Sequence, residues 1–115
     1  MVVAETLHRL HTVTTTVETE ADATRLAQGL IQARLAACVQ VEPIVSHYVW
    51  AQALQQGPEF RLVCKTSATA SGPLLEWLRA HHPYPLPQLL VQTAEATADY
   101  AAWVVAQTTT PPVQA

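Results

Sequence analysis

Residues 39–50 read VQVEPIVSHYVW, and this stretch decides the fold. Its β-branched and aromatic residues favour a strand, and twelve residues is long against the usual length of about five or six. Pro43 cannot donate a ladder hydrogen bond, so the strand lies at a sheet edge or contains a bulge. Its apolar residues fall on both faces, and a long apolar edge must be covered. We therefore predict that a neighbouring subunit covers this strand.

The segment before this strand predicts a strand followed by a helix. Residues 11–17, HTVTTTV, are rich in β-branched residues. Thr19 can cap a helix, and Asp22 three residues later resembles a capping box with a shorter acid. Leucines and alanines then recur at helical spacing, so we expect the helix to run through Ala37.

The segment after this strand predicts a hairpin and a second helix. Residues 55–58, QQGP, are typical of a hairpin turn. Residues 59–66, EFRLVCKT, then form a third strand. The second helix enters at residues 71–73, SGP, or earlier, near Ser67, and it ends before Pro83.

The remaining residues complete the order of elements. Pro83, Pro85 and Pro87 impose an extended segment, residues 88–93 read as a fourth strand, and Thr97 can cap a short last helix. The fold class is therefore α+β, a ferredoxin-like βαββαβ sandwich with a short C-terminal helix. We expect the helices to cover one face of a mixed sheet.

The expected organisation is a single domain over residues 10–107. Residues 1–9 form an N-terminal lead-in, and residues 108–115 form a frayed C-terminal tail.

The composition limits the classes of partner. Only 13% of the 115 residues are charged, about half the usual share of ~25%, so another chain is expected to cover part of the surface. Six basic residues are scattered and the net charge is −3, which argues against nucleic acid. No apolar run approaches the ~20 residues of a membrane span. The N-terminus lacks the apolar core of a signal peptide, and two cysteines make no disulfide scaffold, so we expect a cytoplasmic protein.

Four segments carry a resemblance to a known family. They are Leu35-Ala36-Ala37-Cys38-Val39 with Pro43; Tyr48-Val49-Trp50; Glu59, Leu62, Lys65 and Thr66; and His82-Pro83-Tyr84 with Pro87, Tyr100 and Trp103. In this order and at this spacing they resemble the CutA family of divalent-cation tolerance proteins. The resemblance implies a ferredoxin-like homotrimer with an architecture like that of the PII signalling trimers. It also implies copper or divalent-cation binding and a role in the response to metal ions.

The sequence also departs from the family pattern. Ala51 and Gln52 stand where relatives usually carry an acid and a glycine, and Gln88 stands where they commonly carry a glutamate. Thr14 and Trp77 occupy positions where some relatives have a thiol. A site with several thiolates within one subunit is therefore not expected.

Three residues are candidate ligands of copper or another divalent cation. Cys38 offers a soft thiolate, which favours Cu(I), although a buried structural thiol is the alternative. His81 and His82 offer imidazole nitrogens, but adjacent helical residues do not share a face. The alternative for His82 is a helix-end histidine bonded to the backbone. No metal is expected to be required for folding.

A second group of residues suggests a cleft between subunits. Glu59 and Lys65 lie on one face of a strand, and with Tyr84 and Trp50 they are candidates to line a cleft for an anionic or aromatic ligand. The alternative is a surface ion pair of little energetic value. Tyr48, Trp50 and Trp103 are expected in the trimer interface, where aromatic residues dominate burial.

No catalytic motif is present, and the three glycines cannot make a glycine-rich phosphate loop. We therefore do not expect an enzyme. Two hypotheses remain: a trimeric metal-responsive binding protein, and a PII-like signalling or scaffold trimer that binds a small ligand or a protein in its intersubunit clefts.

Overall fold

The structure is a computed structural model that describes residues 4–109. Its elements in chain order are β1 (Leu7–Val17), α1 (Glu20–Gln32), β2 (Cys38–Trp50), β3 (Ala53–Thr66), α2 (Ala68–His81), β4 (Leu90–Thr97) and α3 (Ala98–Gln107). This order confirms the predicted βαββαβ fold with a short C-terminal helix.

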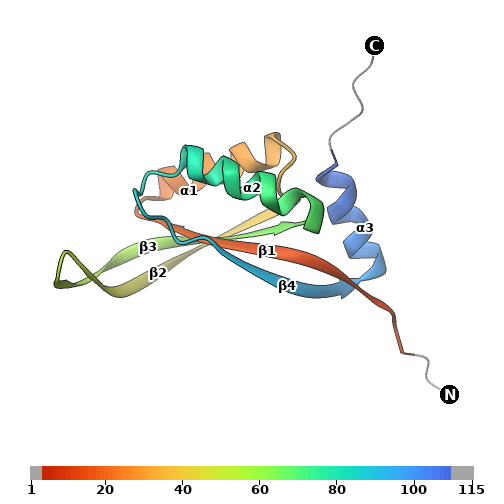
Figure 1. The fold of residues 1–115 in the computed structure, drawn as a ribbon, viewed down its shortest axis with the longest axis horizontal. Coiled ribbons are helices and arrows are strands. Elements are labelled where there is room, and N and C mark those ends of the chain that lie inside the picture. The colour runs from red at the N-terminus through yellow and green to blue at the C-terminus, as the bar shows by residue number, and fades with distance from the viewer. Residues whose placement is uncertain (1–3, 110–115) are drawn as a thin grey trace, which may run out of the picture.

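The four strands form one sheet in the order β2-β3-β1-β4. All three neighbouring pairs are antiparallel, so the prediction of a mixed sheet was wrong. Each helical crossover skips one position in the sheet, because an antiparallel strand is inserted between the two strands that the helix connects. Helices α1 and α2 lie side by side on one face of the sheet (Figure 1).

The main core lies between this face and the two helices. Alternate residues of β1 and β3 point into it, among them Val13, Val17 and Leu62, all with no exposed surface. The helices contribute the fully buried leucines 26, 30, 74 and 78. Residues that face this core recur at every second position on the strands and at every third or fourth position on the helices.

Helix α3 packs elsewhere. Leu10 lies an odd number of residues from Val13 on β1, so it points to the opposite face. It packs with Ala101 and Val104 of α3. Helix α3 therefore covers one end of the face that α1 and α2 leave open, and it stands at the end of the molecule where β4 finishes (Figure 1).

Helix α1 ends at Gln32, five residues before the predicted end at Ala37. The N–H of Arg34 donates to Ile31 and that of Leu35 to Leu30, which is the Schellman pattern. Arg34 has a φ of 58°, a conformation usually left to glycine. Its guanidinium donates to the carbonyls of Ala106 (2.6 Å) and Thr109 (2.9 Å) at the end of α3, so a distant contact holds this chain reversal.

The hairpin turn lies at Ala51 and Gln52, so the prediction of a turn at residues 55–58 was wrong. Trp50 pairs with Ala53, and the φ angles of the two turn residues are 52° and 64°. Two positive φ angles in a two-residue loop make a type I′ turn. The residues QQGP are part of β3, which begins at Ala53 rather than at Glu59.

Pro43 lies in an unbroken register opposite Phe60, so β2 has no bulge there. Trp50 and Ala53, which flank the two-residue turn, form a hydrogen-bonded pair. From there, hydrogen-bonded and non-hydrogen-bonded pairs alternate along the two strands, and the pair of Pro43 and Phe60 is a non-hydrogen-bonded one. Its missing N–H therefore faces the free edge of the sheet, as the edge-strand prediction required.

Other boundaries differ by a few residues. Strand β1 begins at Leu7, inside the expected lead-in. Helix α2 begins at Ala68 and is capped by Ser67, so residues 71–73 lie within it. Strand β4 spans Leu90–Thr97 rather than residues 88–93.

The caps of α1 and α3 also differ from each other. Thr19 caps α1, as predicted, because its hydroxyl oxygen accepts the backbone N–H of Asp22. Thr97 precedes α3 but makes no side-chain capping bond. Of the expected frayed tail, Thr108 is buried and its hydroxyl donates to Val104 (2.8 Å), whereas residues 110–115 lie outside the described part.

Candidate functional site

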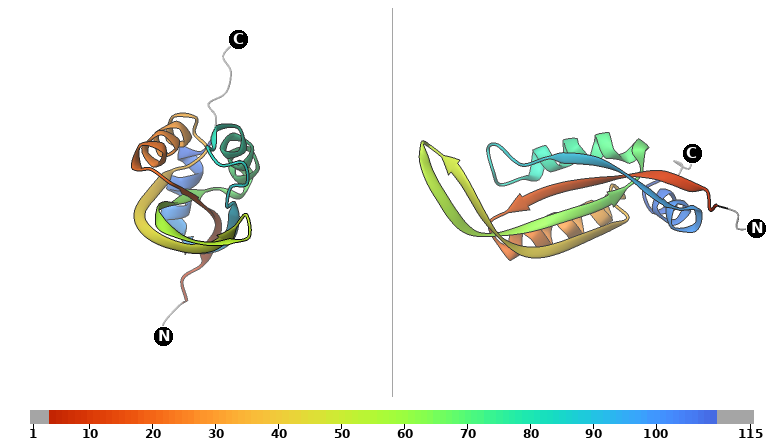
Figure 2. Two further views of the ribbon diagram at one scale, coloured as in Figure 1. Left: turned by 90° about the vertical axis from the view of Figure 1, so that its left-hand side faces the viewer. Right: turned by 90° about the horizontal axis from the view of Figure 1, so that it is seen from below.

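The hairpin of β2 and β3 extends beyond the rest of the sheet. Strand β1 ends at Val17, opposite Phe60, so residues 44–59 pair only with each other within the described chain. This hairpin arm, residues 44–59, projects past the ends of α1 and α2 (Figures 1 and 2). Within residues 4–109, no helix or further strand covers its outer part (Figures 1 and 2).

The hairpin arm carries exposed apolar side chains. Leu54 is 80% exposed, Val49 68% and Val45 62%. The predicted interface residues Tyr48 and Trp50 are about half exposed. Large apolar side chains exposed in this number are candidates for burial against a partner, and β2 also offers an unpaired strand edge.

The third predicted interface residue, Trp103, lies on α3. It is 45% exposed, and its ring packs against that of Tyr100 with centroids 5.8 Å apart. Helix α3 and the tip of the hairpin arm lie at opposite ends of the molecule (Figure 1). Tyr48 and Trp50 therefore do not meet Trp103 within one chain.

Glu59 and Tyr84 are the two predicted cleft residues that the structure brings together. The Tyr84 hydroxyl donates to Glu59 Oε2 at 2.6 Å, although 25 positions separate the two residues. Burial, together with the neighbouring carboxylate, raises the pKa of Tyr84 well above its usual value. The phenol therefore stays protonated and holds the carboxylate at the base of the hairpin arm.

Lys65 and Trp50 lie apart from this pair. Lys65 is on the same face of β3 as Glu59, but six strand residues span about 20 Å. Trp50 is at the tip of the hairpin arm, opposite Ala53. Within one subunit the four residues do not line one cleft.

His82 caps the end of α2, and both of its ring nitrogens are engaged. Nε2 lies 2.9 Å from Thr15 Oγ1, and Nδ1 accepts the backbone N–H of Tyr84 at 3.1 Å. Burial lowers the pKa of this imidazole. A metal would have to displace one of these hydrogen bonds, so the geometry does not favour the predicted role of His82 as a ligand.

His81 points elsewhere, as expected for its neighbour on the helix. Its Nδ1 donates to the Trp77 carbonyl at 2.8 Å, and its ring stacks on the Trp77 indole with centroids 4.0 Å apart. Tying the ring to Trp77 directs it away from His82, so the two histidines do not form one site.

Cys38 is partly exposed at the start of β2, whereas Cys64 is buried. Their register partners are Lys65 and Val39, adjacent positions, so the two thiols point to opposite faces of the sheet. Burial raises the pKa of Cys64 to about 12, which keeps its thiol protonated. Within residues 4–109 no three histidine, cysteine or acidic side chains gather as a metal site.

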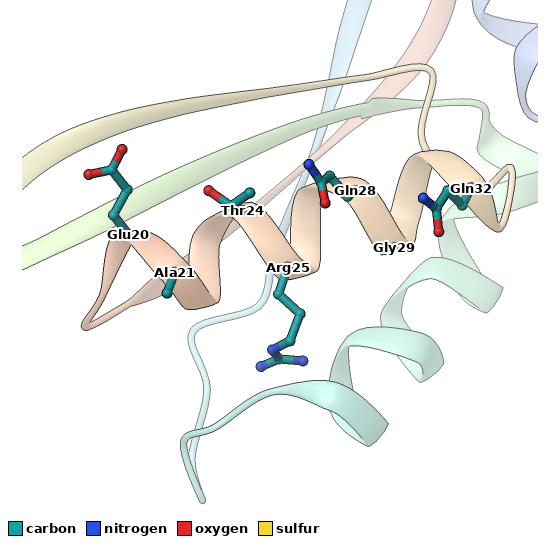
Figure 3. Close-up of a pocket in the computed structure, with 7 residues that line it drawn as sticks. All are labelled: Glu20, Ala21, Thr24, Arg25, Gln28, Gly29 and Gln32. Atoms are coloured by element: carbon teal, nitrogen blue, oxygen red, sulfur yellow. The ribbon is translucent and has the colours of Figure 1, made fainter.

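A shallow depression lies on the outer surface of α1 (Figure 3). It is lined by Glu20, Ala21, Thr24, Arg25, Gln28, Gly29 and Gln32. The Arg25 side chain points toward α2 (Figure 3) and donates to Asp22 Oδ1 and to the His81 carbonyl, both at 3.2 Å. It therefore caps the C-terminus of α2. No predicted site residue lines this depression.

Sequence reasoning missed Thr15 and Arg25, the residues that contact the end of α2. Thr15 looked like any β-branched strand residue, and Arg25 like an exposed helix residue. Both contacts span more than fifty positions, and no local pattern reveals them.

Known proteins resemble this chain in sequence and in fold. Residues 11–107 match the family model described as CutA1 divalent ion tolerance protein. The divalent-cation tolerance protein CutA of Escherichia coli (strain K12 / DH10B) is 38% identical over 91 residues, which are 77% of this chain and 81% of the relative.

The chain belongs to the CutA family. Among solved structures, CutA from Synechococcus elongatus PCC7942 superposes with a TM-score of 0.86 at 37% identity, over 92% of this chain and 95% of that one. A periplasmic divalent cation tolerance protein CutA from Archaeoglobus fulgidus shares the fold, with a TM-score of 0.83 at 22% identity over 89% and 100% of the two chains. No described helix is long and apolar enough to cross a membrane.

Proposed function

We propose that this CutA chain works as a homotrimer that binds copper or another divalent cation in the response to metal ions. The family name supports the link to divalent cations. The exposed hairpin arm is the main observation that supports the proposed homotrimer. We propose no nucleic-acid or membrane partner and no enzymatic activity.

The hairpin arm supports an assembly of identical chains. It presents apolar side chains on both faces and an open edge at one end of the molecule. Helix α3 presents Tyr100 and Trp103 at the other end. Surfaces at opposite ends suit a head-to-tail contact, which closes into a ring when the rotation allows it. A trimer of this kind is like the PII signalling trimers in architecture.

Cys38 is the residue that we retain for a metal site. A thiolate suits Cu(I), and Cys38 is the partly exposed thiol of the chain. One subunit supplies too few ligands within the described residues, but a threefold axis would triple each of them. We leave His81 and His82 out of this site, because the first stacks on Trp77 and the second has both nitrogens engaged. The core is apolar, and we propose no metal requirement for folding.

Native mass spectrometry during a copper titration tests this proposal. The trimer is expected to take up a fixed number of copper ions, and Cys38→Ser is expected to abolish that uptake. Cys64→Ala is the matched control, because a buried and protonated thiol should not contribute. Full copper uptake by Cys38→Ser would mean that Cys38 is not a ligand of the site.

The Glu59–Tyr84 contact favours the second candidate function, a PII-like signalling or scaffold trimer. In that case a small ligand or a protein occupies the intersubunit clefts, and Lys65 or Trp50 reaches the pair from a neighbouring chain. Copper uptake by the trimer that rises without a plateau would favour this function over a specific metal site.

We propose the cytoplasm as the compartment. The two thiols point to opposite faces and cannot pair within the chain, and unpaired thiols suit a reducing compartment. Cell fractionation tests this, and recovery in the periplasm, as in the name of the Archaeoglobus relative, would contradict it.

A further inference from the structure

The two hydrogen bonds of His82 fix its protonation state. The backbone N–H of Tyr84 can only donate, so Nδ1 must carry a lone pair. The ring proton is then on Nε2 and points to Thr15 Oγ1. Only the neutral Nε2–H tautomer makes both bonds, because a charged imidazolium is a donor at both nitrogens.

The surroundings of His82 set the balance between its neutral and charged forms. Helix α1 places Asp22 and Arg25 nearby, and β3 contributes Glu59. Strand β1 contributes the uncharged Thr15 and the backbone of Thr16. The last turn of α2 adds Arg79 and His81, and Tyr84 follows in the loop. Burial is the largest effect and opposes the charged form, as does Arg25, whereas a hydrogen bond to the backbone of Thr16 and the two carboxylates favour it.

Tyr84 connects this histidine to the hairpin arm. Its N–H binds His82, and its hydroxyl binds Glu59 at the base of the arm. Pro83 and Pro85 flank it, and each fixes its own φ angle. The two prolines therefore cannot easily rotate to compensate when the Tyr84 backbone moves, and the Tyr84 side chain moves with its backbone.

We propose that His82 is a proton-operated latch, whose neutral form holds Tyr84 on Glu59 and whose protonation releases the α2–β4 loop from the hairpin arm. A proton on Nδ1 puts two donors face to face, so the bond to the Tyr84 N–H is lost. Release frees the Glu59 carboxylate and loosens the base of the arm. No metal takes part in this step, so it is independent of a copper site.

The latch predicts the direction in which the stability of the protein changes with pH. Because burial holds the folded-state pKa of His82 below its unfolded value, the unfolded chain takes up the proton first as the pH falls. The contribution of His82 to stability is therefore complete above about pH 6.5, the ordinary histidine pKa. It is lost as the pH falls through the lower folded-state value.

Hydrogen exchange of the purified full-length protein, read by mass spectrometry, tests the latch. Peptides covering residues 82–90 are compared between pH ~8 and pH ~5, which bracket the ordinary histidine pKa, after correction for intrinsic exchange. We expect on the order of tenfold loss of protection at the lower pH, the factor that one hydrogen bond contributes. In His82→Gln, which cannot titrate, protection should not depend on pH in this range.

His81→Gln is the matched control, since it removes the adjacent titrating ring and leaves His82 in place. It should keep the full pH dependence. Equal protection at both pH values in the wild type, or a pH dependence that survives in His82→Gln, would overturn the latch. NMR titration of the His82 ring gives a second measurement, and a proton found on Nδ1 at pH ~8 would also overturn it.

Discussion

Gly29 shows how one residue sets the distance between α1 and α2. A Cβ placed there would lie 2.5 and 2.6 Å from two carbons of the Trp77 indole. Trp77 in turn stacks on His81 and packs against the main core. The absence of a side chain at residue 29 therefore lets the indole fill the space between the helices.

Gly29→Ala is expected to destabilise the protein by about 1–3 kcal/mol, the usual cost of overpacking. Helix propensity alone predicts the opposite sign, a gain of about 1 kcal/mol. Denaturant unfolding at fixed protein concentration measures the change. Gly72→Ala on α2 is the control, because a Cβ there meets nothing within 4 Å, and it should stabilise by about 0.5–1 kcal/mol. If both variants gain stability, the indole is not confined as described.

The candidate site shows the limit of sequence reasoning at the residue scale. The sequence assigns Glu59 and Tyr84 to one candidate cleft, but spacing along the chain does not reveal the direct hydrogen bond that joins them in the structure. Lys65 was grouped with Glu59 because both share a face. A shared face does not mean proximity when the strand extends over about 20 Å.

At the scale of elements, the order and type of every helix and strand could be predicted, because β-branched runs, helical spacing of apolar residues, prolines and capping residues mark them. Chain reversals were harder to predict. Helix α1 ends at Gln32, where an alanine-rich sequence would continue. The chain reverses at Arg34, and hydrogen bonds from Arg34 to the distant end of α3 hold that reversal. The turn at Ala51 and Gln52 lacks the usual Asn-Gly signal.

The type I′ turn gives a prediction about the hairpin arm. Ala51 and Gln52 both have positive φ angles, each of which costs about 1 kcal/mol or more for a residue with a Cβ. Replacing them by Asn and Gly should therefore raise the free energy of unfolding by about 1–2 kcal/mol. Thermal and denaturant unfolding of the double variant measure the gain.

Gln56→Gly separates this turn from the one predicted by sequence. Gln56 lies in extended β3, opposite His47, so glycine there should lower stability by about 0.5–1 kcal/mol. Stabilisation by Gln56→Gly and destabilisation by the double variant would place the turn at residues 55–58.

At the scale of the whole molecule, the low charge of the sequence and the exposed hairpin arm have one explanation. With 13% charged residues the chain cannot cover its surface with charge, and the most exposed large apolar side chain that the structure describes, Leu54, lies on the arm. The core of a single chain is complete without the arm. The exposed apolar side chains of the arm therefore add to stability when another chain packs on them.

Trp50→Arg tests this at the tip of the hairpin arm. In a single chain the side chain is half exposed, so the change should leave the fold intact. In an assembly it removes an aromatic anchor, typically worth about 2–4 kcal/mol, and buries an unpaired guanidinium. We expect the proposed trimer to dissociate or to become insoluble, as measured by light scattering coupled to size-exclusion chromatography. Ala80→Arg, on the exposed side of α2, should stay trimeric, and a soluble trimer of Trp50→Arg would place Trp50 outside the interface.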